Sequence, residues 1–116
     1  MAAEQGNTKA QFNLGNGYYT GEGVPQDYKE AFNWYRKAAE QGHSSAQNSL
    51  GVMYANGEGV PQNDKEAYIW FSLSATDGGD VSKKNIELIK TKLSPEQLAE
   101  AQEQATARYK QIEERQ

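Results

Sequence analysis

The octet "TGEGVPQD" spans Thr20–Asp27, and the nearly identical octet "NGEGVPQN" spans Asn56–Asn63, 36 positions later in a chain of 116 residues. A glycine-rich stretch can bind phosphate, but a phosphate-binding P-loop follows a strand and ends in Gly-Lys-Ser or Gly-Lys-Thr. Neither feature accompanies these octets. We therefore interpret each octet as a connection between two helices.

The match extends far beyond the octets. Residues 2–42 compared with residues 38–78 give 22 identical pairs among 41. A repeat period in the thirties is typical of stacked helical hairpins, each of which buries its apolar side against its neighbours. We therefore predict an all-α fold, a single domain over 1–116, with one repeat at 7–42 and a second at 43–78.

Each repeat has sequence signals for two helices. The predicted helix starts, each a capping residue followed three positions later by Gln or Glu, are Thr8, Asp27, Ser44 and Asn63. Capping explains the pair of carboxylates at Asp27 and Glu30 better than acid–base chemistry does, because the pattern recurs at Asn63 and Glu66. We expect Gly21 to end the first helix of copy one with a positive φ, and its counterpart Gly57 to do the same in copy two.

Small residues alternate with aromatic residues along both helices. We expect the small ones to let helix axes approach closely: Gly15, Ala31, Ala38 and Ala39. The large rings would fill the space between neighbouring hairpins: Tyr18, Trp34 and Tyr35. The first helix of each repeat would bury one stripe at i, i+4 and i+8, which is Ala10, Leu14 and Tyr18 in copy one.

The full pattern of copy one resembles the Sel-1-like repeat, a relative of the tetratricopeptide repeat with a longer internal loop. The residues that carry it are Ala10, Leu14, Gly15, Tyr18, Gly21, Gly23, Val24, Asp27, Ala31, Trp34, Tyr35, Ala38, Ala39 and Gly42. Copy two departs from it mildly at Asn63, Phe71 and Ser74. The resemblance implies a right-handed α/α superhelix that binds proteins. Members of the Sel-1-like repeat family include adaptors, assembly factors and bacterial immunity proteins that bind toxins. A cysteine-rich branch is linked to β-lactams, which does not carry over because this chain has no cysteine.

The two ends of the chain differ from the repeats. "MAAEQG" at 1–6 matches the end of a second helix, so we expect a remnant of an upstream repeat and a longer natural protein. We expect 79–116 to form a C-terminal pair of capping helices, the last starting at Ser94 and Pro95. The apolar stripe of that last helix is Leu98, Ala101, Ala105, Tyr109 and Ile112. The alternative is that this stripe mediates dimerisation.

Composition excludes several classes of function. The net charge is −4 and no cluster of basic residues occurs, which argues against nucleic-acid binding. No apolar run approaches a membrane span, so we expect no membrane insertion. The lone histidine, His43, is expected to be a solvated turn residue without metal-binding partners. We expect no cofactor, no catalysis and a monomer. No signal peptide is visible, which leaves a cytoplasmic or a bacterial periplasmic location open.

A candidate binding face lies on the first helices, which line the concave surface in tetratricopeptide arrays. It consists of Lys9, Phe12, Asn16 and Tyr19 in copy one, and of Ser45, Asn48, Val52 and Ala55 in copy two. All four pairs differ although the packing stripe is identical, as expected of a surface that contacts an irregular partner. The aromatic residues Phe12 and Tyr19 would be its anchors, unless an upstream repeat covers them.

We therefore expect a protein or peptide partner and a scaffold, adaptor or toxin-inhibitor role. The alternative from another class is an enzyme or a small-molecule binder with a pocket in the groove. Glu22 and Glu58 are expected at exposed loop tips, where they would either meet a basic partner or only keep the loop soluble.

Overall fold

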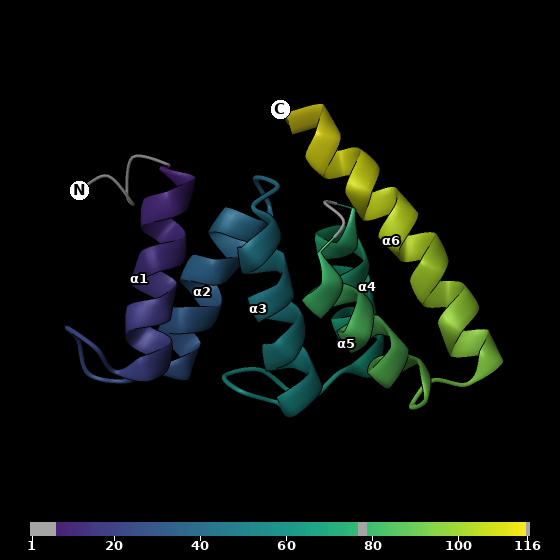
Figure 1. Ribbon diagram of the computed structural model, residues 1–116, viewed down its shortest axis with the longest axis horizontal. Helices are drawn as coiled ribbons and strands as arrows, with labels where there is room; N and C mark the ends of the chain where they lie inside the picture. The colour runs from purple at the N-terminus through teal and green to yellow at the C-terminus, as the bar shows by residue number, and fades with distance from the viewer. Residues whose placement is uncertain (1–6, 77–78, 116) are drawn as a thin grey trace.

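Six helices follow one another along the chain, and no strand occurs in the residues that the computed structural model describes, 7–76 and 79–115 (Figure 1). The helices are α1 (Thr8–Thr20), α2 (Tyr28–Ala39), α3 (Ser44–Asn56), α4 (Asp64–Ala75), α5 (Asp80–Lys90) and α6 (Pro95–Arg115). Residues 1–6, the expected remnant of an upstream repeat, lie outside the described residues.

The first four helices form two hairpins that stack in sequence order. Helix α1 packs against α2, α3 packs against α4, and α2 also lies against α3. Helices α5 and α6 both pack on α4. The long α6 leans across the end of the array (Figure 1). The all-α repeat array predicted from the sequence is confirmed.

The duplicated octets are the connections within the hairpins, as predicted. Gly21 and Gly57 end α1 and α3 with φ of 81° and 69°. The second connection also touches the preceding repeat: a Cβ on Gly59 would lie 2.7 Å from the carbonyl oxygen of Tyr28. The equivalent Gly23 has no such neighbour within 4 Å among the described residues. One sequence therefore serves as a turn in copy one and as a turn and a contact between repeats in copy two.

The predicted starts of the second helices are confirmed. The Asp27 side chain accepts hydrogen bonds from the backbone N–H groups of Lys29 and Glu30. The Asn63 side chain accepts one from the N–H of Glu66. These bonds pair N–H groups that a helix start would otherwise leave without an acceptor.

Helices α1 and α3 begin at Thr8 and Ser44, as predicted, but the residue before each of them provides the capping side chain. Asn7 caps α1, because its Oδ1 accepts from the N–H of Ala10 at 2.8 Å. His43 caps α3, because its Nδ1 accepts from the N–H of Ala46 at 3.1 Å. The hydroxyl of Thr8 instead donates to a side chain outside its own helix. His43 is therefore half-buried and structural, which corrects its interpretation as a solvated turn residue.

The core is built from the small and aromatic positions. Ala31, Ala38 and Ala39 are completely buried. In α3 two residues of the expected stripe, Ala46 and Leu50, are at 0% exposure, and the third, Tyr54, is half-buried. The equivalent positions of α1 are half-buried, since within the described residues no helix packs on its outer side.

Helix α6 uses its apolar stripe within the chain. It starts with a reciprocal capping box: the N–H of Gln97 donates to Ser94 Oγ at 3.1 Å, and the N–H of Ser94 donates to Gln97 Oε1 at 3.0 Å. Ala101, Ala105 and Ile112 are buried in the common core, beside α4. This burial supports a capping role for α6 over dimerisation.

Candidate functional site

The predicted binding stripe lies on α1 and α3, and most of it is half-buried. Lys9 and Ser45 are exposed. The other predicted residues have intermediate exposure: Phe12, Asn16, Tyr19, Asn48, Val52 and Ala55. Several of them bond to other parts of the chain, so the stripe is both a surface and a contact between repeats.

Phe12 joins the two repeats through aromatic contacts. Its ring centroid lies 4.7 Å from that of His43 and 5.8 Å from that of Tyr35. Burial lowers the pKa of His43 below its usual value, because the positive imidazolium loses hydration there. The neutral ring is also the form in which Nδ1 can accept the capping hydrogen bond.

Tyr19 makes a second link between the repeats. Its hydroxyl donates to the carboxylate of Glu58, with oxygen–oxygen distances of 2.8 and 3.0 Å. Burial and the adjacent carboxylate both raise the pKa of Tyr19. Glu58 is therefore half-buried and engaged, not an exposed loop residue as predicted, whereas its counterpart Glu22 is exposed.

The asparagines of the stripe also bond internally. Asn16 Oδ1 accepts a hydrogen bond from the hydroxyl of Tyr35 at 2.6 Å, and burial raises the pKa of Tyr35 to about 12. Asn48 Oδ1 accepts from Asn85 at 3.0 Å and from Ser82 at 3.3 Å, which ties α3 to α5. The amide nitrogen of Asn48 has no acceptor among the described residues.

Two neighbouring hollows follow this face, and we call them together the first-helix groove. They enclose about 150 and 360 Å³ and share Asn48 and Ser49. Of the predicted stripe, the residues that line them are Phe12, Tyr19, Ser45, Asn48 and Val52. Lys9, Asn16 and Ala55 do not line them. The remaining lining residues come from α2, from α3, from the end of α4 and from the start of α5 with its capping residue: Tyr35, Ser44, Ser49, Ser74, Gly79, Asp80, Val81 and Ser82.

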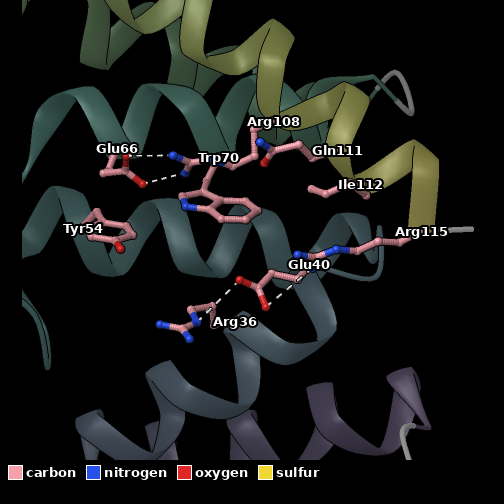
Figure 2. Close-up of a pocket in the computed structure, with 9 residues that line it drawn as sticks. All are labelled: Arg36, Glu40, Tyr54, Glu66, Trp70, Arg108, Gln111, Ile112 and Arg115. Carbon is pink, nitrogen blue, oxygen red and sulfur yellow. Dashed lines mark hydrogen bonds and ion pairs between the residues drawn. The ribbon is translucent and has the colours of Figure 1, made fainter.

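A further pocket lies between α2, α3, α4 and α6, and sequence reasoning missed it (Figure 2). We call it the arginine pocket. Its lining is Arg36, Glu40, Tyr54, Glu66, Trp70, Arg108, Gln111, Ile112 and Arg115. These residues come from four helices, so no local motif marks it. The available signal was compositional: the sequence has three arginines, and all of them line this pocket.

Ion pairs organise the arginine pocket. Arg108 forms two parallel hydrogen bonds with Glu66, at 2.7 and 3.3 Å, and its guanidinium lies 5.3 Å from the centre of the Trp70 ring. Glu66 was predicted to complete a capping box, and its carboxylate instead holds α6 against α4. Glu40 lies 3.6 Å from Arg36 and 3.9 Å from Arg115.

Stacked helical hairpins with a hollowed face define the class of α/α repeat proteins related to the tetratricopeptide arrays. Within that class, the Sel1 repeat family matches residues 8–43 and 44–79, and the chain belongs to this family. Sel1 repeat proteins are generally protein-interaction modules, and the fold is typically a non-catalytic scaffold.

Two solved structures are similar to this chain. One is c5321, a protective antigen that displays an SLR fold and is present in uropathogenic Escherichia coli strains. It is 38% identical over 96% of this chain, with a TM-score of 0.92. The other is a Sel1 repeat protein from Oxalobacter formigenes: 45% identity over 75% of this chain, with a TM-score of 0.72. This chain spans 24% of the first and 36% of the second.

No curated protein matches the chain. Among the described residues, none of the helices has the length and apolar character needed to cross a membrane.

Proposed function

We propose that the first-helix groove binds an extended segment of a partner protein, and that the chain acts as a recognition module without catalysis. The observation that carries this proposal is the contrast between the repeats. The packing positions recur at 36 residues, while each predicted face position differs from its counterpart. A recognition surface requires this combination: the packing residues stay the same from repeat to repeat, and the surface residues differ to fit the partner.

The chemistry of the groove fits a peptide backbone. Asn48 offers an amide N–H group that has no acceptor among the described residues, and Ser45 and Ser49 place hydroxyls beside it. Such groups can bond to the carbonyl and N–H groups of an extended chain. The aromatic rings of Phe12 and Tyr19 add apolar area at the α1 end of the groove.

The two phenols of the groove are hydrogen-bond donors and do not act as general bases. The pKa of Tyr19 and that of Tyr35 are both raised, so these phenols remain protonated hydrogen-bond donors at neutral pH. A general base needs a group that is deprotonated near the working pH. Neither phenol meets that requirement.

The test begins with selection of binders from a random peptide library, followed by NMR mapping of the selected peptide on the ¹⁵N-labelled protein. We expect amide shifts to concentrate at Phe12, Asn48 and Ser82. Asn48→Ala should weaken binding by about tenfold, the equivalent of about 1.4 kcal/mol. The matched control is Asn33→Ala, which changes the same residue type at an exposed position of α2.

Shifts confined to α2, α4 and α6, or equal affinity of the Asn48→Ala and Asn33→Ala variants, would contradict the groove as the binding surface.

A further inference from the structure

The arginine pocket concentrates one kind of side chain. All three arginines of the sequence line it, whereas the nine lysines lie elsewhere. A guanidinium is planar and offers several N–H donors in a fork that matches a carboxylate, while an ammonium acts as a point charge. Arg36 comes from α2, and Arg108 and Arg115 come from α6, so the fold brings separate segments together at this place.

The internal ion pairs do not neutralise all of the positive charge in the pocket. Arg108 is matched by Glu66 in a two-bond pair. Arg36 and Arg115 share the single carboxylate of Glu40 at 3.6 and 3.9 Å, which exceeds hydrogen-bond distance. The pocket thus has one surplus positive charge in a chain of net charge −4. The donors of Arg36 and Arg115 have no hydrogen-bond acceptor among the described residues.

A buried indole N–H adds a neutral donor. Trp70 is 3% exposed, and its Nε1 has no hydrogen-bond partner among residues 7–76 and 79–115. In Figure 2 this nitrogen is turned toward the side of the pocket on which Tyr54 and Glu66 lie. A buried donor without an acceptor is unfavourable, so an acceptor brought into the pocket would be stabilised there.

The cavity measures about 160 Å³. That is several times the space one water molecule needs by the same kind of measure, and it suits a small group of atoms. Ile112 and the Trp70 ring supply apolar contact at its wall.

We propose that the arginine pocket binds a carboxylate that has a carbonyl group beside it. The carboxylate pairs with Arg36 and Arg115, and the carbonyl oxygen accepts from the N–H of Trp70. This chemistry is that of a free acylated amino acid or of the C-terminal end of a peptide chain. The site is separate from the first-helix groove, and the occupant would join α2 to α6.

The test uses the indole N–H resonances of the ¹⁵N-labelled protein. The chain has two tryptophans, and Trp34 serves as the internal control because it lies beside Lys37 and does not line the pocket. The probes are N-acetylglycine, N-acetyl-trialanine with a free carboxylate, the same tripeptide as its C-terminal amide, and inorganic phosphate. We expect a saturable shift of the Trp70 resonance with both carboxylate probes and none with the amide or with phosphate.

The decisive variant is Arg36→Gln combined with Arg115→Gln. Both side chains are more than half exposed, so the fold should persist, which circular dichroism checks. We expect at least a tenfold loss of affinity for the better carboxylate probe. Lys83→Gln combined with Lys84→Gln removes the same charge from the exposed surface of α5 and should leave binding unchanged.

The two possible sources of the carboxylate predict different orders of affinity for the probes. Equal affinity of N-acetylglycine and the tripeptide supports a free small acid, and tighter binding of the tripeptide supports a chain end. The proposal is overturned if no probe gives a saturable Trp70 shift, if the amide or phosphate binds as well as the acid, or if the double arginine variant binds normally.

Discussion

The ring of Tyr35 lies against Gly15 so closely that a Cβ on Gly15 would come within 2.7 Å of it. The same contact recurs one period later, where a Cβ on Gly51 would lie 2.5 Å from the ring of Phe71. In each hairpin, an aromatic ring of the second helix therefore packs directly on a glycine of the first helix.

Gly15→Ala should destabilise the protein although alanine is the better helix former. Overpacking costs about 1–3 kcal/mol, and the gain in helix propensity is about 1 kcal/mol. We expect the free energy of unfolding to fall by up to about 2 kcal/mol in urea denaturation. In a Tyr35→Leu background the ring is absent, so the same substitution should be neutral or stabilising. A stabilising effect of Gly15→Ala in the unmodified chain would show that the ring moves away without cost.

Stability should depend on the ionisation of His43. Its pKa is lowered in the folded state relative to the usual 6.5. The unfolded chain therefore binds the proton more readily, so the contribution of His43 is complete above pH 6.5 and is lost as the pH falls toward the folded-state pKa. His43→Asn keeps a capping side chain, as Asn7 does in α1, and should reduce this pH dependence. Urea denaturation between pH 4.5 and 7.5 measures both, and an unchanged profile in the variant would assign the dependence to other groups.

Tyr19→Phe should weaken the link between the repeats. It removes a hydroxyl that donates to Glu58, and a half-buried bond to a charged group contributes about 1 kcal/mol or slightly more. Because the pKa of Tyr19 is raised in the folded state, its contribution is present below pH 10 and is lost as the pH rises above that value. The Phe variant should therefore lose less stability between pH 9 and 11. Additive effects of Tyr19→Phe and Glu58→Gln in a double-mutant cycle would contradict this coupling.

Ile112→Ala should test whether α6 belongs to the core. Ile112 is 6% exposed, and truncation of a buried isoleucine costs about 2 kcal/mol or more. Tyr109→Ala, on the same helix but 43% exposed, is the control and should cost less. We expect the parent chain and both variants to sediment as monomers, because the stripe packs within its own chain. A change of oligomeric state on losing Ile112 would favour the dimerisation alternative.

Local chemistry explains which parts of the structure the sequence could predict. The starts of α2 and α4 followed from Asp27 and Asn63, whose short side chains cap well and are followed by clear helical patterns. The capping residues of α1 and α3 were misassigned because Thr8 and Ser44 are good capping residues themselves. In copy two the true cap is His43, a residue type that seldom takes this role.

Contacts between distant segments were harder to predict. Comparison of the two repeats pointed to Phe12, Tyr19 and Asn48 as face residues, and all three line the groove. The bond from Tyr19 to Glu58 spans 39 positions, and periodicity says nothing about such pairs. The arginine pocket depends on how α6 crosses α4. That crossing follows from side-chain packing in three dimensions, so no spacing along the chain encodes it.

The close contact between Gly59 and the carbonyl oxygen of Tyr28 has a consequence for longer arrays of this unit. The connection of copy two lies against the backbone of the repeat before it, and the same contact at every step of a longer array would fix the position of one hairpin relative to the next. The loops would then determine the pitch and curvature of an extended array, while the hairpins supply the free energy of folding. Grafting a longer or bulkier loop at that point should bend the array and leave each hairpin intact.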